Sequence, residues 1–192
     1  MTIREVLINI RERLQNAGSE DFEYESWAFL DWKLHIDRAE FYMNPNGEVK
    51  EELLAELESV LKQREQRMPL QYLMGECEFM GYDFYVDERV LIPRQDTECL
   101  VELAVEDIRN IKTLNRCESN NAADQKNEQK VKVLDLCTGS GCIGISVAKL
   151  CPDTEVTLAD ISEGALSVAK KNAQDLNAGV TLIKGNLFEN IE

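Results

Sequence analysis

The sequence predicts an α/β protein in which an N-terminal helical bundle precedes a parallel sheet wound with helices. Apolar residues recur at helical spacing through residues 1–74, which favours the bundle. From residue 131 onward short apolar strands alternate with helical segments, and a glycine-rich turn follows the first strand. Such alternation is typical of a parallel sheet with right-handed connections.

The first helix of the bundle is predicted to begin with a capping box. The side chain of Thr2 can accept a hydrogen bond from the third helical amide, and Glu5 can reach back to the cap. Five apolar residues then share one helical face: Ile3, Val6, Leu7, Ile10 and Leu14. A second helical segment carries Phe22, Tyr24, Trp27, Leu30, Trp32 and Leu34. A third runs from Glu48 through Val49, Leu53, Leu57, Val60 and Leu61 and ends before Pro69.

Residues 75–95 are expected to form a β-hairpin that links two domains. Large apolar side chains alternate about Gly81, at Phe79, Tyr82, Phe84 and Val86. The second domain, residues 96–192, is predicted to open with a helix that Asp96 or Thr97 caps. The apolar stripe of this helix comprises Leu100, Val101, Ala104, Val105 and Ile108. Residues 115–130 contain no large apolar side chain, so we expect a mobile surface loop there.

The rest of the second domain is predicted to run as strand, turn, helix, strand, helix and strand. The predicted strands are VKVLDL at 131–136, EVTLAD at 155–160 and VTLIK at 180–184. The predicted helices are GISVAKL at 144–150 and SEGALSVAKKNAQDL at 162–176. No internal repeat spans the two domains.

Composition narrows the class of function. The 21 Lys and Arg residues against 36 Asp and Glu residues leave a net charge of -15, which repels phosphate backbones and argues against nucleic-acid binding. The six cysteines form no C-x-x-C pair and accompany one histidine, so neither a zinc site nor a disulfide framework is predicted. The N-terminus lacks the apolar core of a signal peptide, and no stretch is long enough to span a membrane. We expect a cytoplasmic protein with reduced thiols, no metal and no membrane association.

The glycine-rich turn indicates a nucleotide-containing ligand. Gly139-x-Gly141-x-x-Gly144, with Asp160 at the end of the next strand, fits a dinucleotide fingerprint, and an ordinary tight turn would also use these glycines. Asp135 distinguishes a dinucleotide from S-adenosylmethionine. A second carboxylate is electrostatically unfavourable beside the pyrophosphate of a dinucleotide and favourable beside an ammonium and a sulfonium. That favours S-adenosylmethionine, with Asp160 accepting hydrogen bonds from both ribose hydroxyls.

Three segments are more specific than the turn. They are R-x-P-L-Q-Y-L-x-G from Arg67 to Gly75, EFMGYDFYVDERVLIPRQDTE from Glu78 to Glu98, and DLCTGSGCIG from Asp135 to Gly144. Together they resemble the HemK/PrmC family, the protein-(glutamine-N5) methyltransferases that modify peptide chain release factors. The resemblance covers the whole chain and implies a helical substrate-docking domain followed by an incomplete Rossmann-like, S-adenosylmethionine-dependent methyltransferase domain.

The resemblance also implies the site. The residues expected to line the cofactor pocket are Asp135, Thr138, Gly139, Gly141, Asp160 and, next to the adenine, Asn186 in GNLF. The segment Ile92, Pro93 and Arg94 is expected near the mouth of the active site. Two positions depart from the family pattern, because Cys137 stands where glycine is usual and Asn186 where aspartate is usual.

The catalytic Asn-Pro-Pro-Tyr segment of the family is absent from this sequence, which reaches Glu192 before the fourth strand of that fold. In the family, the asparagine side chain and a proline carbonyl of this segment accept the two amide protons of the substrate glutamine. The resemblance therefore implies no catalytic residue within the chain, and we expect no turnover by the chain alone. Strand 131–136 would also be an open sheet edge, which predicts self-association.

The favoured function is methyl transfer from S-adenosylmethionine to the side-chain amide of a glutamine in a translation release factor. The alternatives are a ribosomal-protein glutamine methyltransferase, an NAD-dependent oxidoreductase and a non-catalytic binding fragment. S-adenosylhomocysteine and NADH would separate the methyltransferase from the oxidoreductase.

Overall fold

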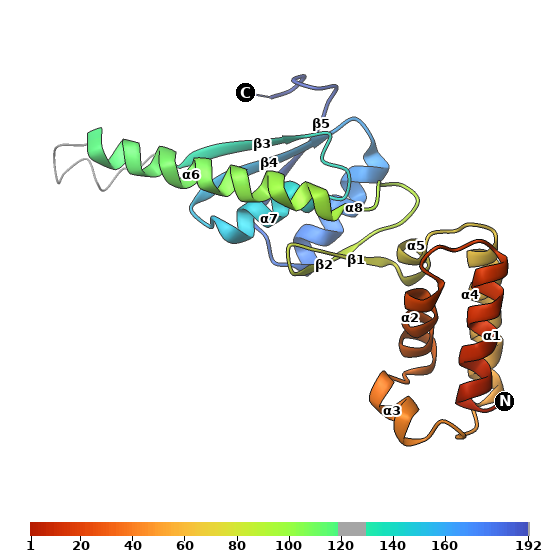
Figure 1. Cartoon of the computed structure of the whole chain (residues 1–192). Helices are drawn as coiled ribbons and strands as arrows, with labels where there is room; N and C mark the ends of the chain where they lie inside the picture. Colours follow the sequence, from red (N-terminus) through yellow and green to blue (C-terminus); the bar gives the residue numbers. More distant parts are fainter. Residues whose placement is uncertain (119–129, 192) are drawn as a thin grey trace. The chain divides into compact units, whose positions relative to one another are not determined.

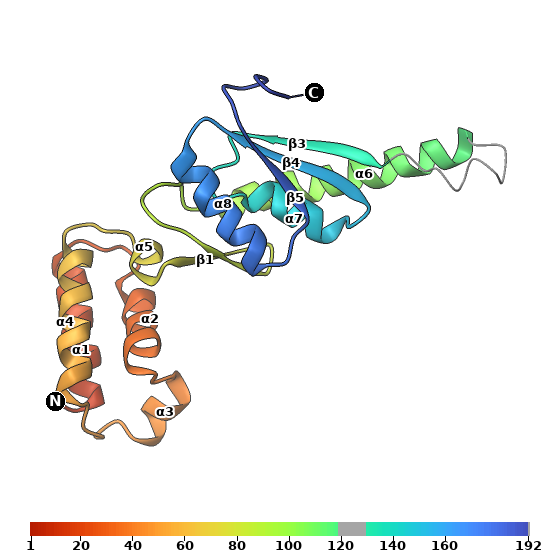
Figure 2. The same cartoon turned by 180° about the vertical axis from the view of Figure 1, so that it is seen from behind.

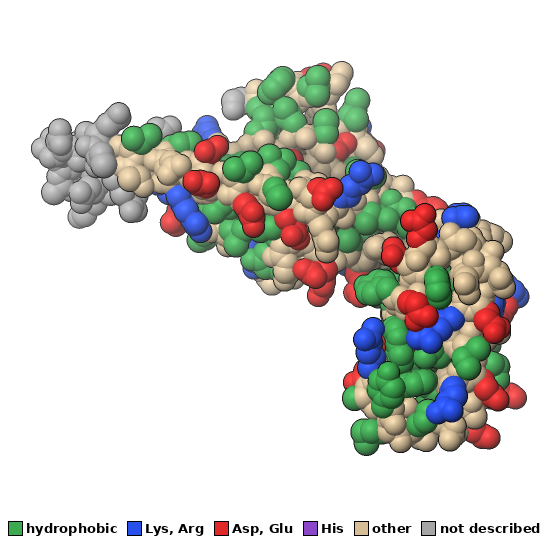
Figure 3. Space-filling view, in the orientation of Figure 1, with side chains coloured by type: hydrophobic (Ala, Val, Ile, Leu, Met, Phe, Trp, Pro, Cys, Tyr) green, Lys and Arg blue, Asp and Glu red, His purple; other side chains and the backbone are tan. Residues whose placement is uncertain are grey.

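A computed structural model describes residues 1–118 and 130–191 of the chain. It divides the protein into two compact units, Met1–Met74 and Gly75–Glu192 (Figure 1). Acidic side chains are interspersed with lysines and arginines over the visible face of each unit and do not gather in one patch (Figure 3). No helix in the described parts of the chain is long and apolar enough to cross a membrane.

The N-terminal unit is helical, as the sequence predicts. Its helices are α1 (Ile3–Asn16), α2 (Phe22–Leu34), α3 (Arg38–Met43), α4 (Glu51–Glu65) and α5 (Leu70–Met74). The predicted capping box is present at α1, since the Thr2 amide donates to Glu5 Oε2 at 2.8 Å and the Glu5 amide donates to Thr2 Oγ1 at 3.3 Å. The predicted face of α1 is fully buried in the core of this unit.

Ion pairs tie the helices of this unit together around that core. Arg64 of α4 donates to both carboxylate oxygens of Glu25 in α2, at 2.9 and 2.7 Å, and both side chains are largely buried. Arg13 of α1 bridges Glu58 and Glu65 of α4. The buried charges of these ion pairs therefore lie beside opposite charges. A buried charge without such a partner would strongly destabilise the fold.

The second unit begins with the hairpin, made of β1 (Glu76–Phe79) and β2 (Tyr82–Tyr85) in antiparallel register. Met80 and Gly81 join the strands with φ values of 53° and 74°, the positive values that a two-residue hairpin turn of the primed type requires. Phe79 and Phe84 are completely buried, with ring centroids 6.1 Å apart, in the same core as α6 and α7. The segment expected to link two domains therefore packs into the second one.

Three parallel strands follow in the order β3–β4–β5: β3 (Val131–Leu136), β4 (Thr154–Asp160) and β5 (Val180–Lys184). Helices α6 (Glu98–Glu118), α7 (Cys142–Leu150) and α8 (Glu163–Asp175) lie on one face of this sheet (Figures 1 and 2). Val156 and Leu158 of β4 point into the core on that face. The predicted strand–helix alternation and the parallel pairing are confirmed.

Helix α6 begins directly after Thr97, one of the two predicted caps, but the exposure of Leu100 and the C-terminal end of the helix differ from the prediction. It starts at Glu98, after a 3₁₀ turn over Gln95–Thr97, and Leu100 is 53% exposed although its neighbours Val101, Val105 and Ile108 are buried. The helix also continues through residues 115–118, where a loop was expected. Each further residue of a helix gains a backbone hydrogen bond, so a polar end needs no core contact to persist. The rest of the expected mobile loop, residues 119–129, lies outside the described residues.

Candidate functional site

The turn after β3 is shaped by three residues in the left-handed backbone region. Cys137, Gly139 and Gly141 have φ values of 59°, 56° and 83°. The Thr138 amide donates to the Ala159 carbonyl of β4 at 3.0 Å, which ties the turn to the neighbouring strand. Glycine adopts this conformation without cost, whereas Cys137 carries a Cβ that disfavours it.

Asp135 holds the inner side of the turn. It is only 8% exposed, and its Oδ2 accepts hydrogen bonds from Thr138 Oγ1 at 2.6 Å and from the Gly144 amide at 3.0 Å. Burial raises the pKa of this carboxyl, and the two hydrogen bonds act in the opposite direction. Both hydrogen bonds go to Oδ2, which fixes the orientation of the carboxylate between the turn and the start of α7.

Asp160 ends β4 on the other side of the turn. Its Oδ2 accepts from the Gly139 amide at 3.0 Å, and its Oδ1 accepts from the Ser162 amide at 2.9 Å. A carboxylate oxygen has more than one acceptor position, so each oxygen retains room for a second donor. Two backbone amides thus fix the carboxylate in place while leaving it able to accept from a pair of hydroxyls.

A small pocket of about 50 Å³ opens beside Asp160. It is lined by Leu136, Cys137, Ala159, Asp160, Ile161, Gly185, Asn186 and Leu187. The pocket lies at the carboxyl ends of the three strands, the edge where ligands bind in open α/β sheets. The structure therefore brings the sequence-predicted residues Asp160 and Asn186 together, with the turn residue Cys137 in the same lining.

The segment Ile92–Arg94 is held at a different point of the second unit. Cys77 Sγ of β1 lies 3.6 Å from the Pro93 carbonyl, and the Thr97 amide donates to the Arg94 carbonyl at 2.9 Å. Burial raises the pKa of the Cys77 thiol. Among the described contacts, none joins this segment to the pocket beside Asp160, so its place near the mouth of the site stays a prediction.

Gly141 and Gly144 allow α7 to pack closely. A Cβ on Gly141 would lie 2.7 Å from Ile145 Cδ1, and one on Gly144 would lie 2.2 Å from Leu158 Cδ2. Both distances are shorter than real Cβ contacts, so a Cβ at either position would force the neighbouring side chain to shift. Gly139, whose Cβ would meet nothing within 4 Å, leaves open space at the turn. The first residue of α7, Cys142, is buried, which raises the pKa of its thiol to about 11.

Sequence reasoning missed Asn172, which joins three parts of the second unit. It lies in α8 and is 1% exposed. Its Nδ2 donates to the carbonyls of Tyr85 at 3.0 Å and Ser140 at 2.8 Å, and its Oδ1 accepts from the Tyr85 amide at 2.7 Å. A signal was available, because the apolar stripe of α8 contains this one amide among Ala165, Val168, Ala169 and Ala173.

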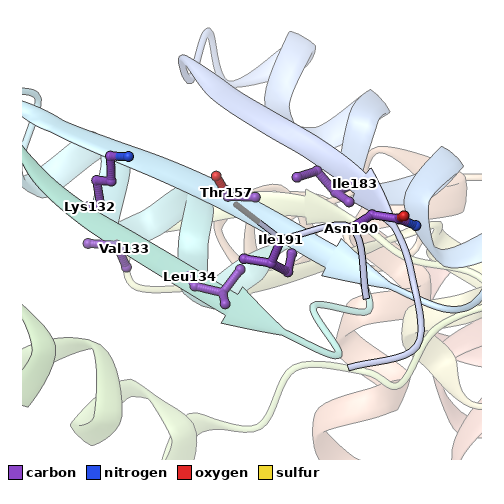
Figure 4. Close-up of a pocket in the computed structure, with 7 residues that line it drawn as sticks. All are labelled: Lys132, Val133, Leu134, Thr157, Ile183, Asn190 and Ile191. Carbon is purple, nitrogen blue, oxygen red and sulfur yellow. The ribbon is translucent and has the colours of Figure 1, made fainter. Parts of the chain in front are cut away.

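A second pocket, of about 270 Å³, lies over the sheet (Figure 4). Its lining residues are Lys132, Val133, Leu134, Thr157, Ile183, Asn190 and Ile191. Leu134, Thr157 and Ile183 alternate along their strands with the core residues, so they belong to the face of the sheet opposite the helices. The lining is mostly apolar and carries none of the site residues that the sequence predicts.

Comparisons with known proteins agree with the two-unit division. Residues 5–75 match the family model described as the PrmC N-terminal domain, and residues 121–192 match the methyltransferase small domain. A release factor glutamine methyltransferase of Clostridium acetobutylicum is 38% identical over 98% of this chain and 61% of its own length. One from Geobacter sulfurreducens is 37% identical over 98% of this chain and 60% of its own length. The chain thus spans about three fifths of the length of the curated relatives it matches.

The solved structures that resemble this chain match a smaller part of it than these relatives do. The crystal structure of ribosomal protein L11 methylase from Lactobacillus delbrueckii subsp. bulgaricus is 24% identical, with a TM-score of 0.35, over 52% of this chain and 42% of that protein.

Proposed function

We propose, because this chain resembles the HemK/PrmC family along nearly its whole length, that it is the docking and cofactor-binding part of a protein-(glutamine-N5) methyltransferase. The methyl donor is S-adenosylmethionine, and the acceptor is the side-chain amide nitrogen of a glutamine in a peptide chain release factor. The site of action is the cytoplasm, where translation ends.

The observation that carries the proposal is the fixed carboxylate of Asp160 beside the glycine turn. Its two oxygens are oriented by the amides of Gly139 and Ser162, and each can still accept from a hydroxyl. Vicinal ribose hydroxyls are the matching donor pair. Open space above Gly139 lets a ligand approach the backbone, and Asn186 supplies an amide in the lining of the same pocket.

S-adenosylmethionine supplies an electrophilic methyl group on a sulfonium. Asp160 would hold its ribose, Asn186 would lie next to its adenine, and Oδ1 of Asp135 would face its positively charged methionine end. Thr138 and Gly144 keep the Asp135 carboxylate in that orientation through their bonds to Oδ2. A buried carboxylate gains most from a cationic partner, since the local dielectric is low there.

The amide of glutamine is a poor nucleophile, because its lone pair is delocalised into the carbonyl. Hydrogen-bond acceptors that orient its two N–H groups would align the nitrogen for in-line attack. The family resemblance assigns this role to an Asn-Pro-Pro-Tyr segment, which the sequence does not contain. In this proposal the 192 residues bind cofactor and partner, and the groups that orient the amide are not among them.

The helical unit is the part that would dock the protein substrate, by its resemblance to the PrmC N-terminal domain. The second unit would also pair with other chains through β3, because that strand has a partner on one side only among the described residues. A net charge of -15 leaves the protein a poor ligand for nucleic acid.

Calorimetric titration tests the proposed cofactor. S-adenosylhomocysteine should bind the chain, whereas NADH should not, since two carboxylates beside a pyrophosphate repel it. Binding of NADH in preference would favour an oxidoreductase instead. A pull-down with a release factor, against a ribosomal protein that carries a methylatable glutamine, would then separate the two protein substrates.

A further inference from the structure

Asn172 makes a set of hydrogen bonds that no other side chain of similar size can make. The Tyr85 amide can only donate, and the carbonyls of Tyr85 and Ser140 can only accept. One acceptor and two donors are therefore needed within a single short side chain. Aspartate lacks the donors, alanine lacks all three groups, and glutamine is longer by a methylene.

Asn172 and Asp160 hold the cofactor turn at two neighbouring residues. Ser140 lies between Gly139 and Gly141, and Asn172 holds its carbonyl, while Asp160 holds the Gly139 amide. The turn is thus fixed from two directions by two residues that lie in different elements. Loss of either bond would allow the left-handed turn to relax, because its backbone conformation is not held by side-chain packing at Gly139.

The same side chain also binds the outer edge of β2. Its amide pairs with both the N–H and the C=O of Tyr85, as a neighbouring strand would do. From Tyr85 the chain continues to the segment Ile92–Arg94, which the family resemblance places near the mouth of the site. Asn172 therefore connects the cofactor turn to the backbone that leads to the proposed substrate entrance.

We propose that Asn172 is a positioning residue of the cofactor site, which acts by fixing the Ser140 carbonyl and the end of β2 relative to Asp160. This inference rests on the proposed function. It assigns Asn172 no contact with the ligand. Its role is to hold the Gly139 amide and the carboxylate of Asp160 in the arrangement that the ribose requires.

The test compares Asn172→Ala and Asn172→Asp with Thr154→Val. Thr154 is as suitable a control as the chain offers, because it is 7% exposed and its Oγ1 donates to the Cys151 carbonyl at 2.6 Å, at the end of β4 opposite to Asp160. Both Asn172 variants should weaken S-adenosylhomocysteine binding about tenfold or more. Thr154→Val should destabilise the unit and change affinity by less than about twofold.

Amide hydrogen exchange gives a readout that needs no ligand. In Asn172→Ala the amides of Tyr85, Gly139 and Gly141 should all lose protection. In Asn172→Asp the Tyr85 amide should keep part of its protection, since the carboxylate still accepts from it, while the turn amides become exposed. Thr154→Val should leave the protection of all three unchanged.

The outcomes separate this inference from the proposed function. If the unaltered chain binds no S-adenosylhomocysteine, the proposed function fails, and the exchange pattern alone decides whether Asn172 fixes the turn. If Thr154→Val weakens binding as much as the Asn172 variants do at equal loss of stability, Asn172 is merely structural. Unchanged protection of the turn amides in Asn172→Ala would overturn the inference.

Discussion

Gly144 of α7 and Leu158 of β4 approach so closely that a Cβ on the glycine would lie 2.2 Å from Leu158 Cδ2. That Cβ would also lie 3.0 Å from Asp135 Oδ2, the oxygen that accepts from the Gly144 amide. Helix α7 therefore lies so close to the sheet that a Cβ at residue 144 would force Leu158 and Asp135 to shift. The position of the Asp135 carboxylate depends on this seating.

Gly144→Ala should destabilise the second unit by about 1–3 kcal/mol, because overpacking forces α7 away from β4. Gly139→Ala is the control: its added Cβ meets nothing, and its cost is about 1 kcal/mol for the left-handed backbone. Urea unfolding followed by circular dichroism measures both. The only two tryptophans, Trp27 and Trp32, lie in the N-terminal unit, so the fluorescence transition should not move. Equal losses in the two variants would contradict the packing argument.

Cys137→Gly should stabilise the second unit by up to about 1 kcal/mol, because glycine tolerates the φ of 59° that the cysteine adopts under strain. Asn177→Gly provides the comparison, since Asn177 has a similar φ of 53° but asparagine accepts that region readily. Thermal unfolding should show the larger gain at residue 137. S-adenosylhomocysteine should also bind more tightly, and weaker binding would mean that the thiol contacts the ligand.

Asp160→Ala should weaken S-adenosylhomocysteine binding by about tenfold or more, because each charge-assisted hydrogen bond to a ribose hydroxyl contributes roughly 1.5–3 kcal/mol when buried. Asp175→Ala is the matched control, as that carboxylate forms an exposed ion pair with Lys171 in the same unit. Calorimetry on both variants makes the comparison. An unchanged affinity in Asp160→Ala would remove this residue from the site.

The stability of the N-terminal unit should fall in acid through Glu58 and Glu65. Hydrogen bonds from Arg13 hold the pKa of both carboxyls below their ordinary value of 4.5. A depressed pKa stabilises the folded state above that ordinary value, and the stabilisation is lost as the pH falls through the lower folded-state pKa. Both carboxylates are partly exposed, so the effect is below about 1 kcal/mol.

Arg13→Met should make the stability of the N-terminal unit less dependent on pH. Tryptophan fluorescence, recorded during unfolding at neutral and at acidic pH, measures this stability. Lys184→Met, which breaks an exposed pair with Glu163 in the other unit, should leave its pH dependence unchanged. The same pH dependence in Arg13→Met as in the unaltered chain would show that the ion pairs contribute nothing.

The chain should self-associate through β3, whose outer edge has no paired strand among the described residues. Leu134→Lys places a charge on the uncovered face of that edge strand and should reduce association, as edge lysines do in natural sheets. Thr157→Lys is the control, because it places the same charge on the same face but on the central strand β4, which is paired on both sides. Light scattering measures the mass, and a monodisperse monomer of the unaltered chain would contradict the edge argument.

Sequence periodicity predicted the elements that bury a continuous stripe, which is why α1 and the three parallel strands were found. It could not predict α3, which buries no residue and so leaves no apolar pattern, although Asp37 caps it through the Glu40 amide at 2.7 Å. Leu100 fitted the stripe of α6 by spacing alone, but the helix turns it outward, and only the packed structure fixes that rotation.

Asp160 was predicted from its place at the end of a strand, and Asn186 only from the family resemblance. Both line one pocket because the carboxyl ends of parallel strands lie at the same edge of the sheet. Asn172 was not predicted because its partner Tyr85 is 87 residues away in the sequence, and no local sequence pattern indicates a hydrogen bond over that separation. The only sequence signal for this role was the position of an asparagine within the apolar stripe of α8.

Each unit buries its own core, and the two cores share no residue. A substitution in one core therefore leaves the packing of the other core unchanged. Substitutions among the buried residues of the helical unit leave the glycine turn and its carboxylates intact, so the two units can diverge in sequence at different rates.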